Sequence, residues 1–172
     1  HYKLEVVPRQ FIKKFPNPIP MEIVYEGLQP WLEEKPDNKL LDSLRILLPI
    51  DKSWGVEEYV SANDWGSDIR IWKEDEIIEN IVFRYSEIDD WNLMISFLNI
   101  VRESDYVLVV SKGYIIEPEE KEIKNNFRNS AAGQFKNDPE SAIIRAAEAA
   151  TEFDKLGKKE KFNDQFRMPG SK

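Results

Sequence analysis

The feature that most constrains the fold is the way apolar residues recur in the middle of the chain. Apolar and polar residues tend to alternate in three short segments, 56–60, 69–72 and 77–85, and turn-forming residues separate the segments. A period of two is typical of a strand with one buried face, and short turns join antiparallel neighbours. The three segments therefore predict an antiparallel meander.

A helical period replaces this alternation after residue 86. Trp91, Met94, Leu98 and Val101 lie three or four residues apart, which predicts a buried amphipathic helix over 88–102. Ser86 and Asp89 have the spacing of a capping box, with Asp in place of Glu, just before this stripe. We expect this helix to be the most buried in the protein.

A second pair of strands follows the helix. Residues 106–110 form an apolar run without alternation, which indicates a central strand covered on both faces. The turn 111–113 then leads into a short strand at 114–116 and closes a second hairpin.

Three more helices are predicted from the helical spacing of apolar residues and from residue types that are typical of helix starts and ends. They cover about 38–47, a segment starting near Pro118 with Ile123, Phe127 and Ala131 on its inner face, and a last segment from Asp138 to Gly157. Strands in hairpins combined with helices that do not alternate with them are typical of an α+β fold. We expect a mainly antiparallel sheet, a three-stranded meander plus a second hairpin, packed by about three helices.

Proline is concentrated at the amino-terminal end of the sequence, where six of the ten prolines fall before residue 37. Each proline removes an amide donor, so no long helix is expected there. The segment is nonetheless rich in apolar residues, and we expect residues 1–37 to form a proline-rich arm packed on a single globular domain of residues 1–156. Residues 157–172 carry five Lys or Arg and two Asp or Glu and are predicted to be a mobile basic tail.

Several catalytic chemistries are excluded by composition. The chain has no cysteine, and its single histidine is His1. Thiolate nucleophiles, cysteine zinc sites and Ser-His-Asp triads within one chain are therefore impossible. Neither a dinucleotide-binding nor a P-loop glycine pattern occurs. We expect no metal and no cofactor, and a binding role in preference to an enzymatic one.

The charge balance points to the kind of partner. The formal net charge is -8, and residues 51–156 alone carry 12 Lys or Arg and 23 Asp or Glu. Such a chain repels phosphate backbones and anionic lipid, and no apolar run approaches the length of a membrane span. We expect a soluble, cytoplasmic protein that binds neither nucleic acid nor membrane.

The residues most typical of a binding site lie near the predicted strand ends. They comprise two tryptophans beside glycines and four carboxylates: Trp54, Asp64, Trp65, Asp68, Asp89 and Asp90. Exposed indoles anchor interfaces, and gathered carboxylates speed association with a basic protein. The same residue types also suit an ordinary hairpin turn, a buried indole and a solvated acidic surface.

The leading hypothesis is therefore an acidic protein-binding module that recognises a basic partner. In composition such a small acidic α+β chain resembles some bacterial immunity proteins, which neutralise basic toxin nucleases, and no residue roles are carried over from that resemblance. Two alternatives stay open. One is a carbohydrate-binding or carbohydrate-cleaving domain that uses Trp65 with Asp64 and Asp68. The other is a structural subunit that self-associates through a sheet edge or its last helix.

Overall fold

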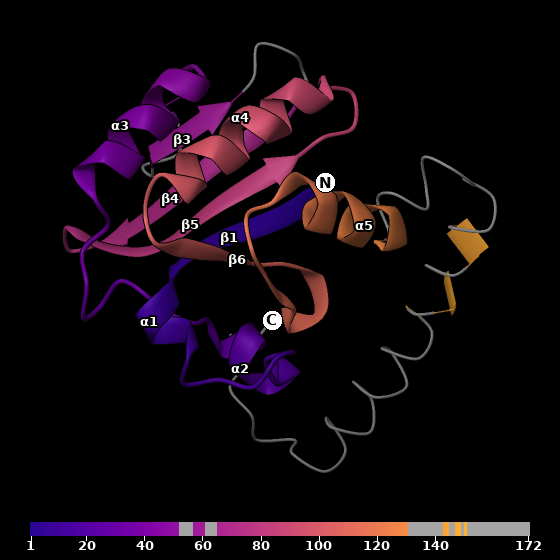
Figure 1. Cartoon of the computed structure of the whole chain (residues 1–172), viewed down its shortest axis with the longest axis horizontal. Coiled ribbons are helices and arrows are strands. Elements are labelled where there is room, and N and C mark those ends of the chain that lie inside the picture. Colours follow the sequence, from indigo (N-terminus) through magenta and orange to yellow (C-terminus); the bar gives the residue numbers. More distant parts are fainter. Residues whose placement is uncertain (52–56, 61–64, 131–142, 145–146, 149, 151–172) are drawn as a thin grey trace. The chain divides into compact units, whose positions relative to one another are not determined.

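The computed structural model describes residues 1–51, 57–60, 65–130, 143–144, 147–148 and 150, and side chains between 51 and 64 are not part of this description (Figure 1). The chain divides into two compact units, His1–Ala132 and Gly133–Lys172. In the second unit the described residues are helical, in keeping with the helix predicted after Asp138. The rest of that prediction and the predicted tail at 157–172 lie outside the described residues.

The first unit is built on one antiparallel sheet with the order β2-β3-β4-β5-β1-β6-β7. Its strands are β1 (Tyr2–Pro8), β2 (Ile50–Asp51), β3 (Glu57–Val60), β4 (Asp68–Glu74), β5 (Ile77–Tyr85), β6 (Tyr106–Val109) and β7 (Ile115–Ile116). The helices of this unit are α1 (Arg9–Ile12), α2 (Met21–Glu26), α3 (Asn38–Leu47), α4 (Trp91–Arg102), α5 (Glu120–Asn129) and the short 3-10 helix η1 (Ser111–Gly113). Helices with a mainly antiparallel sheet confirm the α+β class.

Both predicted groups of strands are confirmed. The meander consists of β3, β4 and β5, and the second hairpin joins β6 to β7 through η1. The predicted strands end at residue 72 and begin again at 77, but the turn between β4 and β5 consists of Asp75 and Glu76 alone. Both residues have positive φ. Two positive φ values in a row give the backbone twist that matches a two-residue hairpin. The edge strand β2 was not predicted.

The start of the chain requires a correction. Residues 2–8 are not part of an arm: they form β1, an inner strand between β5 and β6. Tyr2, Leu4 and Val6 are buried on one face and alternate with Lys3 and Glu5, which is the period of a half-buried strand. Pro8 stands at the end of the strand, where a missing amide donor is tolerated. The density of prolines further along concealed this short alternation.

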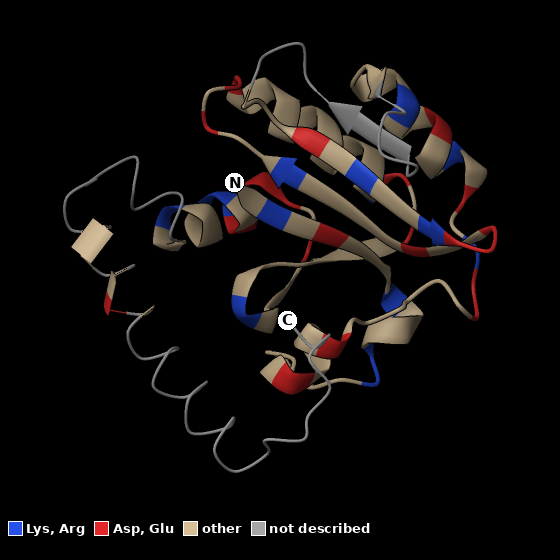
Figure 2. Ribbon diagram, turned by 180° about the vertical axis from the view of Figure 1, so that it is seen from behind, with Lys and Arg blue, Asp and Glu red and all other residues tan. Residues whose placement is uncertain are grey.

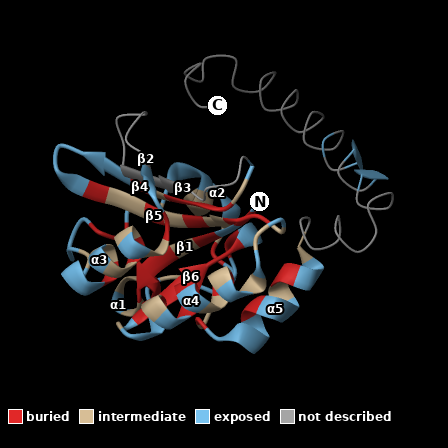
Figure 3. Ribbon diagram, turned by 90° about the horizontal axis from the view of Figure 1, so that it is seen from above, coloured by how far each residue is buried: buried red, intermediate tan, exposed pale blue. Residues whose placement is uncertain are grey.

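Two apolar clusters lie on opposite faces of the sheet. The larger cluster lies between the sheet and α3, α4 and α5, and the smaller cluster lies between β1, β6 and the segment containing α1 and α2. In β6, Tyr106 and Leu108 belong to the larger cluster, whereas Val107 and Val109 belong to the smaller. The predicted central strand with two covered faces is thereby confirmed, and Figure 3 shows burial concentrated around β1 and β6.

The helix ends differ from the predicted ones at two places. The helix predicted at 38–47 is confirmed as α3, capped by the Asp37 side chain. However, α4 begins at Trp91 because the Asp90 carboxylate accepts a hydrogen bond from the Asn92 N–H, so Asp90 is the cap and Ser86 is not. The helix predicted from Pro118 begins two residues later as α5, with Ile123 and Phe127 buried as expected; Ala131 lies outside the described residues.

The outer edge of β7 is covered by a side chain. Asn17 donates its amide N–H to the Ile115 carbonyl at 3.1 Å, and the Ile115 N–H donates to the Asn17 side-chain oxygen at 3.0 Å. The amide thus imitates a neighbouring strand at this residue. Free edge groups are a template for pairing with another chain, so Asn17 counters self-association at this edge of the sheet.

Asn17→Ala is expected to lower the free energy of unfolding by about 1–2 kcal/mol, because two hydrogen bonds are lost. The variant should also sediment with a concentration-dependent dimer fraction that the wild type lacks, since Ile115 then offers its N–H and C=O to another chain. Urea unfolding and sedimentation velocity measure the two effects, with the exposed Asn38→Ala on α3 as the control. Equal stability and equal sedimentation of both variants would contradict this role.

Candidate functional site

The most exposed tryptophan in the described chain lies just before β4. The Trp65 side chain is 85% exposed, and its backbone has a positive φ of 67°. Indoles are usually largely buried, and a non-glycine residue rarely adopts positive φ. Packing of the core therefore explains neither the position nor the exposure of this side chain.

Hydrogen bonds fix the loop that carries Trp65 to the loop after β5. The Ser67 N–H donates to the Asp89 carboxylate at 2.6 Å, and the Ser86 N–H donates to the buried Ser67 hydroxyl oxygen at 2.7 Å. The Tyr85 hydroxyl donates to the Asp89 carbonyl at 2.9 Å. Two loops that are distant in sequence are thereby held side by side.

Carboxylates surround this junction. Residues 86–91 contain Glu87, Asp89 and Asp90 and no basic residue, and Ile88 among them is 58% exposed. Asp90 is exposed at the start of α4, whereas Glu87 and Asp89 are half-buried. We call the set Trp65, Glu87, Ile88, Asp89 and Asp90 the Trp65 surface. It combines an exposed aromatic group, an exposed aliphatic group and three carboxylates.

The acidic character continues from this surface onto α5. The Trp91 indole N–H donates to the Glu120 carboxylate at 3.2 Å and so joins the starts of α4 and α5. Glu119 is the residue just before α5, and Glu122 belongs to its first turn. A basic ligand on the Trp65 surface therefore approaches more carboxylates than those of residues 86–91 alone.

The other predicted site residues are placed differently. Trp54 and Asp64 lie outside the described residues. Asp68 is only 6% exposed and accepts a hydrogen bond from Arg84 at 3.1 Å, with the Arg70 Nε at 3.2 Å. Of the pair Trp65 and Asp68, only the indole is open to a ligand.

Asp68 belongs to a charged part of the sheet. The face of β1, β5 and β4 turned away from α3 and α4 carries a set that we call the polar half-face: Lys3, Glu5, Asp68, Arg70, Trp72, Asn80 and Arg84 (Figure 2). Burial raises the pKa of Asp68, while Arg84, Arg70 and Lys3 act in the opposite direction. Burial raises the pKa of Glu5 to about 7. Sequence reasoning missed Glu5, although its alternation with Leu4 and Val6 was visible.

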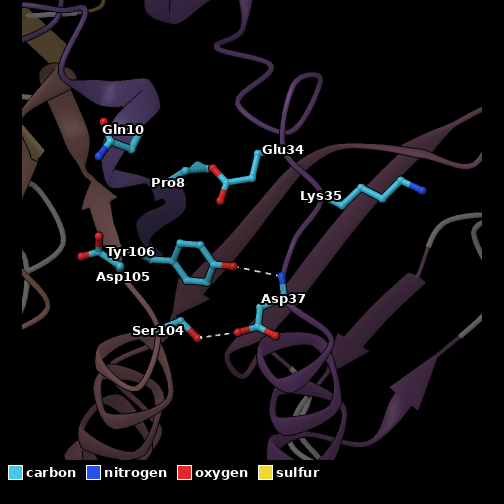
Figure 4. A pocket seen from close by; sticks show the side chains of 8 residues that line it. All are labelled: Pro8, Gln10, Glu34, Lys35, Asp37, Ser104, Asp105 and Tyr106. Atoms are coloured by element: carbon cyan, nitrogen blue, oxygen red, sulfur yellow. Dashed lines mark hydrogen bonds between the residues drawn. The ribbon is translucent and has the colours of Figure 1, made fainter.

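A pocket of about 300 Å³ lies where the end of β1 meets the start of α3 and of β6 (Figure 4). Its lining includes Glu34, Lys35, Asp37, Ser104 and Tyr106. The Asp37 N–H donates to the Tyr106 hydroxyl oxygen at 2.9 Å, and the Ser104 hydroxyl donates to the Asp37 carboxylate at 3.2 Å. These bonds connect α3 to the strand after α4, so they have a clear structural role.

Arg9 organises the neighbouring end of the sheet. Its guanidinium pairs with Asp105 at 2.8 Å and with both carboxylate oxygens of Glu117. This cation lowers the pKa of Glu117. Among the described residues, no group of three His, Cys, Asp or Glu side chains could hold a metal ion, and no helix is long and apolar enough to cross a bilayer.

Comparison with family models, with curated proteins and with solved structures found no match for this chain. The function is therefore inferred from the geometry of this chain alone.

Proposed function

We propose that this chain is a non-enzymatic protein-binding module that docks a basic partner protein on the Trp65 surface. The observation that carries the proposal is the exposure of an indole two residues before Ser67, whose N–H and hydroxyl are hydrogen-bonded to a second loop. An aromatic anchor that is already held in place loses little conformational entropy on binding. Size and acidity suit an immunity-type bacterial protein that neutralises a basic toxin in the cytoplasm.

The carboxylates support the choice of a basic partner. Glu87, Asp89 and Asp90 lie in the segment that holds the indole, and the whole chain has a net charge of -8. A negative field of this kind increases the rate at which a cationic protein arrives. Lys or Arg side chains of the partner can then contact both the carboxylates and the face of the indole.

Affinity capture with variants tests the proposal. Immobilised wild-type protein should retain a basic protein from a lysate of the source organism, and Trp65→Ala should weaken the binding of that purified protein about 30-fold or more, since hot-spot aromatics contribute about 2 kcal/mol. Trp72→Ala is the control, since Trp72 lies on the polar half-face. The exposure of Trp65 predicts that Trp65→Ala changes the unfolding free energy by less than about 0.5 kcal/mol.

A second variant removes charge without removing hydrogen-bond acceptors. Glu87→Gln, Asp89→Asn and Asp90→Asn together keep acceptors for the Ser67 and Asn92 N–H groups and delete three negative charges. Asn caps helices about as well as Asp, so α4 should stay intact. A partner that binds this triple variant and Trp65→Ala as tightly as the wild type would rule out the Trp65 surface.

A further inference from the structure

The polar half-face is a second surface, and packing of the fold does not explain why polar side chains occupy it. The smaller apolar cluster covers only the side of the sheet around β1 and β6, and Figure 2 shows no described helix over the opposite half of that face. Strand pairing fixes the layout: Glu5 lies opposite Val82, and Trp72 lies opposite Asn80. Residues of three strands therefore form one continuous polar surface.

The Asp68 Oδ1 and the Arg70 Nε pair with each other at 3.2 Å, and three further polar atoms of this surface are buried without a hydrogen-bond partner. They are the Glu5 Oε2, the Asn80 Oδ1 and the Arg84 Nε, and the three residues surround Val82 on β1 and β5. A buried polar group without a partner costs about 1–3 kcal/mol. An apolar side chain at each position would remove that cost, so the retention of all three calls for an explanation other than stability.

Glu5 is the clearest of the three. Burial alone raises its pKa to about 7, in a strand where the neighbouring positions on β5 and β6 are Val82 and Val109. The terminal torsions of Glu and Asn are broad and nearly two-fold. Rotation about these torsions therefore reorients the oxygens of Glu5 and Asn80 at little cost when a ligand offers donors to them.

An indole borders the same group of atoms. Trp72 is 40% exposed and lies directly across from Asn80, so a flat apolar ring stands beside a planar amide. Two acceptors, one donor and an aromatic face are thus gathered on β1, β5 and β4.

We propose that the polar half-face binds an oligosaccharide. Each sugar hydroxyl both donates and accepts, so neighbouring hydroxyls can satisfy Glu5 and Asn80 as acceptors and Arg84 as a donor. The C–H face of a sugar ring can stack on the Trp72 indole. A phosphate-rich ligand meets the carboxylates of Glu5 and Asp68, and an apolar ligand leaves all three polar atoms without partners.

The strand spacing sets the length of the ligand. Two spacings of about 4.8 Å separate β1 from β4, and Trp72 lies two residues along β4 from Arg70, the residue in line with Glu5 and Val82, so a ligand that reaches both Glu5 and Trp72 spans about 12 Å. This length matches a disaccharide unit or a longer chain better than a single sugar ring. The site is distinct from the Trp65 surface and does not depend on the proposed protein partner.

Calorimetric titration with a defined set of hexasaccharides tests the proposal: cellohexaose, maltohexaose, xylohexaose, mannohexaose and chitohexaose. At least one should bind with a Kd below about 1 mM. Trp72→Ala and Asn80→Ala should each weaken that binding about tenfold, and Glu5→Gln should do so by replacing a carboxylate with a poorer acceptor. Trp65→Ala is the matched control and should bind the sugar like the wild type.

Three outcomes would overturn the proposal. The first is no heat of binding from any of the five sugars at concentrations up to about 10 mM. The second is sugar binding that persists in Trp72→Ala and Asn80→Ala while circular dichroism shows both variants folded. Binding of poly-lysine that is lost in Glu5→Gln, with no sugar response, would identify a protein-docking face and also overturn the sugar assignment. None of these results bears on the Trp65 surface, because the control variant separates the two sites.

Discussion

Gly113→Ala is expected to destabilise the protein by about 3 kcal/mol, which corresponds to a fall in Tm of about 10 °C for a chain of this size. Gly113 has a positive φ of 80°, where an alanine is strained. A Cβ at this position would also lie 2.5 Å from the Ile19 carbonyl oxygen, and that oxygen belongs to backbone that cannot simply rotate away. The Ile19 N–H donates to the Gly113 carbonyl at 2.8 Å, so relief of the clash disturbs this bond.

Gly27→Ala is the matched control for this prediction. Gly27 has a positive φ of 94°, but nothing lies within 4 Å of the Cβ that alanine would add. Its cost should be about 1 kcal/mol, the backbone contribution alone. Thermal unfolding of both variants measures the difference, and equal losses of stability would show that the approach of Ile19 to Gly113 does not matter.

Glu5→Gln is expected to stabilise the protein by up to about 3 kcal/mol at pH 8 and to have little effect near pH 4.5. The pKa of Glu5 rises from the ordinary value of 4.5 to about 7 in the folded state. Below pH 4.5 the Glu5 carboxyl is protonated in both the folded and the unfolded state, so its full contribution to the free energy of unfolding is present. As the pH rises towards 7 the unfolded chain ionises first, and this contribution is lost.

Urea unfolding across pH 4.5–8 compares Glu5→Gln with the wild type. The charged groups on the same face are Lys3, Arg84, Arg70 and Asp68, and they are unchanged in both proteins. Glu22→Gln, an exposed substitution on α2, controls for the change in net charge. A Glu5→Gln stability difference that is the same at both ends of the pH range would contradict the burial of an ionisable Glu5.

The sequence predicts the local elements well and the order of strands poorly. Alternation and helical stripes identify the meander, the second hairpin, α3 and α4, because these patterns come from neighbours along the chain. Pairing of β1 with both β5 and β6 depends on residues about 80 or 100 positions away. A short strand before a proline-rich segment gives no local signal of such partners, so its central place could not be predicted.

The candidate site shows the same contrast between local features, which the sequence predicts, and strand pairing, which it does not. The sequence indicates Trp65 as a site residue because it stands beside a glycine near a strand end, and the structure places its indole in solvent. The sequence also indicates Asp68 because it lies near a strand end, yet Asp68 is buried beside Arg84 because β4 pairs with β5. The link from Ser67 to Asp89 and the polar half-face both arise from strand pairing. The spacing of residues along the sequence predicts neither of these features.

The rate of association with the captured partner tests the central claim most directly. Stopped-flow mixing at about 20 mM and about 500 mM salt should show the rate constant falling at least about tenfold, because exposed carboxylates are screened over this range. Trp65→Ala should mainly speed dissociation, whereas the triple variant at Glu87, Asp89 and Asp90 should show a weaker salt dependence of the association rate constant. A rate constant that is the same at both salt concentrations, together with an unchanged Kd for Trp65→Ala, would contradict docking of a basic partner on the Trp65 surface.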